Sequence, residues 1–187
     1  MPWKRPTKRR IRAIRDRLRA MYGRPVNEPH REPIAELVRT VLSQHTSDLN
    51  RDRAFAGLRA RFPAWDEVRD APVDEVEEAI RSGGLGKQKA PRIQAILERL
   101  GERPDLAWTE TAPAQESLAY LVALPGVGRK TAACMLMFTW GIPEIPVDVH
   151  VYRVGGRLGL FPAKASFEYA HDEMQALVDP EDAYELH

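Results

Sequence analysis

The feature that most constrains this chain is a helical spacing of apolar residues that recurs along almost its whole length. The clearest case is an apolar set at i, i+3, i+4, i+7 and i+8, the pattern of a helix that buries one face. It consists of Ile34, Leu37, Val38, Val41 and Leu42. The same spacing predicts helices over residues 8–22, 33–43, 48–62, 73–80, 93–100, 118–122, 132–138 and 167–177. Prolines and glycines separate most of these segments, so the sequence predicts an all-α fold.

One segment fits two patterns. Residues 145–151 alternate apolar and polar side chains as a strand does, whereas residues 147–158 also place their apolar side chains on one face of a helix. We favour the helix because its pattern is longer, and because Asp148 would then lie in the first turn, where the helix dipole stabilises negative charge.

Charge is distributed unevenly along the chain. Residues 1–24 contain ten Lys or Arg and one acidic residue, Asp16, so the net formal charge of this stretch is +9. The net formal charge of the whole chain is only +1, so the remaining residues carry −8. Two interpretations stay open: contact with a nucleic acid, or an amphipathic helix whose solvent face is rich in arginine.

Composition excludes several functional classes. The single cysteine, Cys134, allows no internal disulfide and no set of thiolates for a zinc or iron–sulfur site. No apolar run reaches the length of about 18 residues that a membrane span needs, and no apolar segment follows the basic N-terminus as in a secretory signal. We therefore expect an intracellular, cytoplasmic protein without a membrane partner.

The segment Leu124-Pro125-Gly126-Val127-Gly128-Arg129-Lys130-Thr131-Ala132 lies between two predicted helices. Its two glycines allow a tight turn with close approach of a ligand, and amides at the start of the following helix suit a phosphate. A nucleotide phosphate loop would need a glycine directly before the lysine, where Arg129 stands. A plain helix–helix turn explains Gly126 but not a second glycine followed by two cations.

This segment resembles the helix-hairpin-helix of the DNA glycosylase superfamily, and specifically that of endonuclease III. The family also carries a Val-Asp-x-His-x-x-Arg pattern, which this chain matches as Val147-Asp148-Val149-His150-Val151-Tyr152-Arg153. Weaker similarity covers residues 42–48 and 84–90, so the resemblance extends over about residues 30–187.

The resemblance implies a bifunctional DNA glycosylase and abasic-site lyase of base-excision repair. Its fold would be a two-lobed helical bundle with the active site in the cleft between the lobes. Residues 25–140 would form one lobe, with the hairpin at its end, and residues 1–24 and 141–187 the other. The partner would be damaged double-stranded DNA, the damaged base an oxidised pyrimidine, and the protein a monomer.

The resemblance also implies the site residues. Lys130 would attack the sugar and form a Schiff base, assisted by Asp148. Leu85 and the Gln44/His45 pair would fill the gap left by the extruded base, although the family's wedge glutamine aligns with His45 and not with Gln44. Leu85 could instead be a loop residue tucked into the core. The complete set of expected DNA contacts is Gln44, His45, Leu85, Lys87, Lys89, Pro125, Gly126, Val127, Gly128 and Arg129.

The residue types suit this chemistry. An uncharged lysine amine can attack a sugar carbon, and the positive end of a helix dipole disfavours its ammonium form. The helical residues 130–140 advance about 16 Å and the extended residues 141–147 can span about 23 Å, so Asp148 can return to Lys130. There it could stabilise a cationic transition state or relay protons.

The chain departs from the family pattern in one respect. Close relatives of endonuclease III carry four cysteines for a [4Fe–4S] cluster, and these are absent here, so we expect no cofactor. An element begins at Pro180 and is unfinished at His187, from which we expect reduced stability and weaker DNA binding than in a longer form. We expect His150 to be a buried hydrogen-bonding residue, and we expect no metal site.

Two alternatives remain. A helix-hairpin-helix module could hold DNA without cutting it, and such a module would need neither Lys130 nor Asp148. A monofunctional glycosylase similar to the adenine-mismatch enzymes is less well supported, because those enzymes typically lack a lysine at this position.

Overall fold

The computed structural model describes residues 3–102 and 105–187. Within these ranges the chain is helical and contains no strand, which confirms the all-α prediction. The α-helices are α1 (Lys8–Tyr22), α2 (Pro33–Ser43), α3 (Asp48–Arg61), α4 (Trp65–Asp70), α5 (Val73–Ala79), α6 (Gly86–Leu100), α7 (Ala114–Val122), α8 (Arg129–Trp140), α9 (Val149–Arg157), α10 (Phe167–Leu177) and α11 (Ala183–Leu186). Short 3-10 helices are η1 (Arg81–Gly83), η2 (Ala107–Glu110) and η3 (Pro180–Asp182).

The largest differences from the sequence prediction are at two helices. Helix α6 begins at Gly86, seven residues before the predicted start, because its first turn carries polar side chains that an apolar pattern does not register. Helix α4 was not predicted, since its six residues bury only Val68. The ambiguous segment after residue 147 is a helix, as favoured, but Asp148 is the N-cap of α9 and not a first-turn residue.

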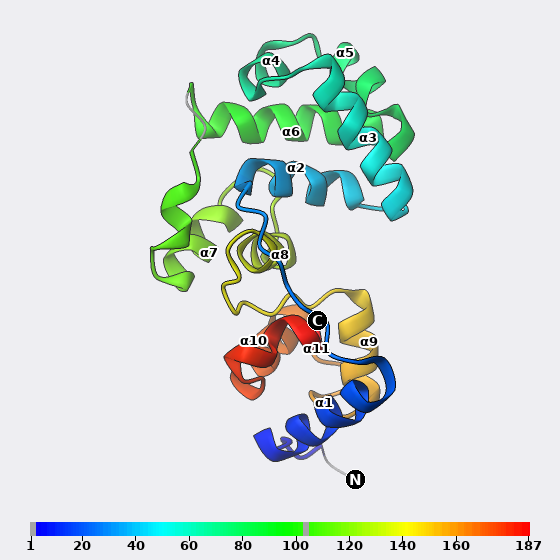
Figure 1. Ribbon diagram of the computed structural model, residues 1–187, viewed down its shortest axis with the longest axis vertical. Coiled ribbons are helices and arrows are strands. Elements are labelled where there is room, and N and C mark those ends of the chain that lie inside the picture. The colour runs from blue at the N-terminus through cyan, green and yellow to red at the C-terminus, as the bar shows by residue number, and fades with distance from the viewer. Residues whose placement is uncertain (1–2, 103–104) are drawn as a thin grey trace.

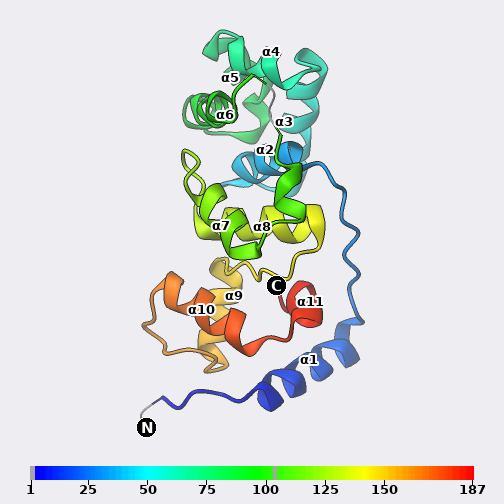
Figure 2. The same cartoon turned by 90° about the vertical axis from the view of Figure 1, so that its left-hand side faces the viewer.

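The elements are arranged along one long axis (Figure 1). Helices α3 to α6 lie at one end, α9 to α11 and α1 lie at the other, and α8 lies between them. Residues 131–137 of α8 are all buried, as expected for a helix enclosed on every side. The segment that joins α1 to α2 runs along one side of the molecule (Figure 2).

Buried apolar side chains form two separate clusters. One is drawn from residues 34–136 and holds α2, α3, α5, α6 and α8 together. The other is drawn from Ile11 of α1 and from residues 145–183. The chain therefore returns to its own N-terminal helix to complete the second cluster.

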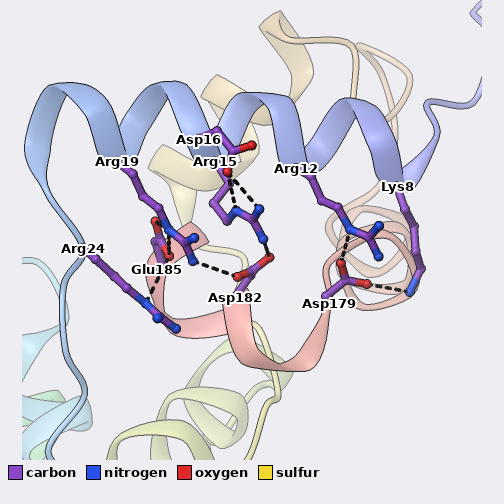
Figure 3. Close-up of polar contacts among 9 residues, drawn as sticks. All are labelled: Lys8, Arg12, Arg15, Asp16, Arg19, Arg24, Asp179, Asp182 and Glu185. Atoms are coloured by element: carbon purple, nitrogen blue, oxygen red, sulfur yellow. Dashed lines mark hydrogen bonds and ion pairs between the residues drawn. The ribbon is translucent and has the colours of Figure 1, made fainter.

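The basic N-terminal helix faces the C-terminal segment of the chain, and its cations are paired with carboxylates there (Figure 3). Lys8 and Arg12 lie 3.2 and 2.7 Å from Asp179. The hydrogen bond from Arg12 holds the pKa of the Asp179 carboxyl below its ordinary value, so this carboxyl stays charged at neutral pH. Further pairs join Arg15 and Arg19 to Asp182, Arg19 and Arg24 to Glu185, and Arg5 to Glu173.

These pairs contradict the interpretation of the basic helix as a nucleic-acid contact for the side chains involved. The alternative, a solvated arginine face, is also incomplete, because Asp182 is 1% exposed and its two arginine partners are only partly exposed. Most of the cations of residues 1–24 are therefore paired with carboxylates of residues 173–185, and these ion pairs join the N-terminal helix to the C-terminal segment.

Candidate active site

Lys130 is the second residue of α8, and its half-buried side chain lines two cavities. The inner cavity, of about 760 Å³, is formed mainly by the segment 26–30, α2, α3 and one face of α8. The hairpin cavity, of about 690 Å³, is formed by residues 43–46, the start of α8, residues 147–150 and α10. Thr40, Ser43 and Lys130 belong to both cavities, so Lys130 lies where they meet.

Asp148 lines the hairpin cavity together with Lys130. Its Oδ1 accepts hydrogen bonds from the amides of His150 at 2.8 Å and Val151 at 2.7 Å, which caps α9. These two bonds fix the orientation of the carboxylate. The amine and the carboxylate singled out by the sequence therefore face one cavity, from helices on either side of it.

Two other titratable groups lie beside this pair. Burial raises the pKa of the Cys134 thiol to about 11, while the nearby Lys130 charge acts in the opposite direction, so Cys134 stays a neutral thiol. Burial lowers the pKa of His171, in the wall of the hairpin cavity, to about 4. Both groups are therefore uncharged at neutral pH.

The hairpin joins α7 to α8. Pro125, Gly126 and Gly128 are exposed, and Gly126 has a φ of 70°, which favours glycine. A Cβ at Gly126 would lie 2.5 Å from Nε of Arg92, so a side chain there would also displace this arginine. Val127 is different: its side chain is 4% exposed and its amide donates to the carbonyl of Leu124 at 3.1 Å. The expectation that Val127 supplies a free amide to DNA is therefore wrong.

Arg129 follows the hairpin, but its side chain turns toward α10. Its Nη1 lies 3.0 Å from Glu168 and 2.7 Å from Asp172. A DNA phosphate would have to compete with two carboxylates for this guanidinium. The role of Arg129 as a phosphate contact stays a prediction, and it would require exchange of these two exposed ion pairs for a phosphate.

The residues predicted to act as wedges lie on two loops. His45 is exposed with a φ of 55°, and Leu85 is 44% exposed with a φ of 54°. The alternative placement of Leu85 in the core is therefore wrong. The Gln44 side chain instead accepts a hydrogen bond from Nη1 of Arg92 at 2.7 Å.

The structure decides two of the next three predictions and leaves that for Lys87 open. Lys87 is exposed near the start of α6, where a phosphate could reach it. Lys89 is 1% exposed, so the prediction that it contacts a phosphate is wrong. His150 is exposed, with Nδ1 3.0 Å from Nη2 of Arg153, so the prediction that it is buried is also wrong. The sequence analysis missed Arg92 and His171, because a single Arg or His on a predicted helix carries no signal of its position.

The residues of this chain do not fit the iron–sulfur cluster of the family. Such a cluster needs four thiolate ligands, and the one cysteine of the chain is buried within α8. Within the described ranges no group of three or more His, Cys, Asp or Glu side chains is placed to hold a metal ion. In the same residues, no helix combines the length and the apolar character needed to cross a membrane.

The known proteins that this chain resembles are DNA glycosylases and base excision repair proteins. The profile of the HhH-GPD superfamily base excision DNA repair proteins matches residues 38–180. A candidate DNA glycosylase of Arabidopsis thaliana is 32% identical over 97% of this chain and 74% of its own length. Endonuclease III of Thermotoga maritima is 33% identical over 86% of this chain and 71% of its own length.

The solved structures agree with the sequence comparison. The structure of a trapped covalent intermediate between endonuclease III and DNA superposes with a TM-score of 0.81 at 30% identity, covering 97% of this chain and 83% of the other. A non-covalent complex of endonuclease III with DNA gives a TM-score of 0.80 with the same coverage.

Proposed function

The chain belongs to the HhH-GPD superfamily of base excision DNA repair proteins, and to the endonuclease III family within it, and from this premise we propose that it is a bifunctional glycosylase and abasic-site lyase. That it is a DNA glycosylase of base-excision repair follows from the family. The lyase activity, its residues and its substrate are the proposal. The observation that carries it is the shared cavity of Lys130 and Asp148.

The proposed reaction begins when Nζ of Lys130, without its proton, donates its lone pair to C1′ of the extruded nucleotide. The bond from C1′ to the base breaks, and the base leaves with the bonding electrons and takes up a proton. The sugar ring then opens, so that C1′ and Nζ form a Schiff base and O4′ becomes a hydroxyl. Loss of a proton from C2′ expels the 3′ phosphate, and water finally hydrolyses the Schiff base and regenerates the amine.

The surroundings of Lys130 support this sequence. Lys130 is in the first turn of α8, where the helix dipole disfavours the ammonium form. Asp148 presents a fixed carboxylate to the same cavity, suited to stabilise positive charge on the sugar or to move the C2′ proton. The hairpin, with Gly126 and Gly128 exposed, lies beside both and can approach the DNA backbone closely.

The inner cavity supports a place for the extruded base. Its volume of about 760 Å³ is that of a small-molecule site, and it opens beside Lys130. Its wall combines an aromatic side chain, Phe138, with Glu36, His30 and Asn27, which can hydrogen bond to the edge of a base. We propose an oxidised pyrimidine in damaged double-stranded DNA as the substrate, acted on by a monomer in the compartment that holds the DNA.

Borohydride reduction tests the proposal. Mixed with DNA that contains an abasic site, the protein should form a covalent adduct, and Lys130→Gln should abolish the adduct while leaving DNA affinity within about threefold, because few contacts are lost. Lys4→Met, which removes an exposed lysine at the far end of the molecule, is the matched control and should be trapped as the wild type is. Absence of an adduct with the wild-type protein would favour a DNA-binding module without lyase activity.

The base is identified by a second measurement. Release of free base from a panel of duplexes, each with one lesion, should be fastest for oxidised pyrimidines. Faster release of adenine from a mismatch would replace this substrate with that of the adenine-mismatch enzymes.

A further inference from the structure

A buried lysine lies outside the proposed chemistry. Lys89, in the first turn of α6, is 1% exposed, and its Nζ donates to the carbonyl oxygens of Leu42 at 2.7 Å and Gly83 at 2.8 Å. Burial lowers the pKa of this amine. Among the described residues, no carboxylate lies within ion-pair distance of it. An ammonium group is costly to bury, so its position calls for an explanation beyond packing.

The two carbonyl groups belong to the starts of the two predicted wedge loops. Leu42 is in the last turn of α2 and precedes the loop with His45, and Gly83 ends η1 and precedes Leu85. Both His45 and Leu85 have a positive φ, near 55°, a conformation that a residue with a side chain keeps only when its surroundings enforce it. Lys89 thus directly bridges the ends of α2 and η1, which lead into the two loops.

A second residue of α6 extends this arrangement. Arg92, about one turn after Lys89, donates to the Gln44 side chain at 2.7 Å and passes so close to Gly126 that a Cβ there would clash with it. One face of α6 therefore contacts the His45 loop, the Leu85 loop and the hairpin. These are the three segments that the sequence analysis assigned to DNA.

We propose that Lys89 is a positioning residue for base extrusion, which holds the His45 and Leu85 loops at a fixed separation through its two carbonyl bonds. This inference rests on the proposed function, because it takes these loops to enter the DNA. Extrusion of a base costs the free energy of unstacking and unpairing it. The inserted side chains can displace the base only if the loops that carry them keep their position. Charge-assisted bonds in a buried site resist such displacement more than neutral ones.

The test separates extrusion from chemistry. Lys89→Met keeps an unbranched side chain that is one atom shorter, and it removes the amine and both of its hydrogen bonds. Extrusion is followed by the fluorescence of 2-aminopurine placed at the target position of a duplex, at saturating protein, and chemistry by borohydride trapping at an abasic site, where no base has to be unpaired. We expect the fluorescence rise to fall by about tenfold and trapping to change by no more than about twofold. Lys4→Met serves as the control and should match the wild type in both assays.

A merely structural role would give another pattern. Equal losses in the two assays, or no loss in either, would overturn the proposal, as would a Lys89→Met protein that extrudes 2-aminopurine as the wild type does. If circular dichroism shows that Lys89→Met does not fold, Arg92→Met, a half-buried position on the same helix face, must show the same split between the assays. A wild-type protein that raises the fluorescence but is never trapped would refute the proposed lyase and leave Lys89 to be judged by fluorescence alone.

Discussion

Asp148 caps α9, and the proposed function gives its carboxylate a second role that substitution can separate from the cap. Its Oδ1 accepts two amide hydrogen bonds, at 2.8 and 2.7 Å, and so caps α9, while the carboxylate charge faces the cavity of Lys130. Asp148→Asn keeps an oxygen that can cap the helix and removes the charge. Asp148→Ala removes both.

The expected stabilities follow from the cap. Loss of an N-cap costs about 1 kcal/mol, and in a chain of this size each 1 kcal/mol lowers Tm by about 2–4 °C, so Asp148→Ala should melt about 2–4 °C below the wild type. Asn caps about as well as Asp and forgoes only the attraction of the charge to the helix dipole, about 0.5 kcal/mol, so Asp148→Asn should melt within about 2 °C.

The expected activities follow from the charge. Both variants should lose trapping rate at an abasic site by about 10²–10⁴-fold, the range for a positioned acid or base. Ser166→Ala provides the matched control, because Ser166 caps α10 through a hydrogen bond from the amide of Tyr169 at 3.1 Å. It should lose about as much Tm as Asp148→Ala and keep the wild-type trapping rate.

The two measurements are differential scanning calorimetry and single-turnover trapping. A wild-type trapping rate for Asp148→Asn would refute the reasoning, since the carboxylate would then be a helix cap alone. A large loss of trapping in Ser166→Ala would show that small losses of stability, and not charge, account for the effect.

Three other predictions concern stability. Burial lowers the pKa of His171 from an ordinary 6.5 to about 4, so between these pH values the unfolded chain binds a proton at this residue and the folded chain does not. The free energy of unfolding should therefore fall by about 3 kcal/mol as pH falls from 6.5 to 4. His171→Gln should flatten the profile of Tm against pH over that window, and an unchanged profile would contradict this assignment. Asp182→Asn should lower Tm far more than Asp16→Asn, because both carboxylates pair with Arg15 but only Asp182 is buried and pairs with Arg19 as well; similar melting curves would disprove this difference. Gly155→Ala should lower Tm because its Cβ would meet a buried aromatic ring at 2.8 Å, whereas Gly156→Ala, at 3.6 Å, should raise it slightly; shifts of the same sign would show that the ring moves aside.

Much of the fold could be predicted from local sequence patterns. Apolar spacing located most of the helices, because a helix that packs on one side must repeat its buried residues about every 3.6 positions. It failed at the start of α6 and at α4, where the first turn is polar or the helix too short to repeat its pattern. The sequence prediction placed Asp148 in the first turn of α9, whereas it is the N-cap, one position earlier. Aspartate is favourable at both positions, so its identity does not distinguish them.

The candidate site was also predicted only in part from the sequence. The hairpin glycines, Lys130 and Asp148 were recognised from motifs, whose spacing reflects local backbone geometry. The expectation for Lys89 as a DNA contact failed because the residue is buried, whereas Arg129 and several N-terminal arginines are paired with carboxylates of the same chain. A cation on a helix has the same sequence signature whether it faces a phosphate, a carbonyl or a carboxylate.

The sequence by itself therefore determined most of the helices, the hairpin and the two motifs that contain Lys130 and Asp148, because each of these depends on neighbours a few positions apart. Only the tertiary structure decided which cations are paired with carboxylates and which carbonyl groups bind the buried Lys89. Those outcomes depend on partners far away in the chain: Asp182 for Arg15, Glu168 for Arg129 and Leu42 for Lys89. Burial and pairing of a charge are properties of the surrounding volume, and no local pattern encodes them.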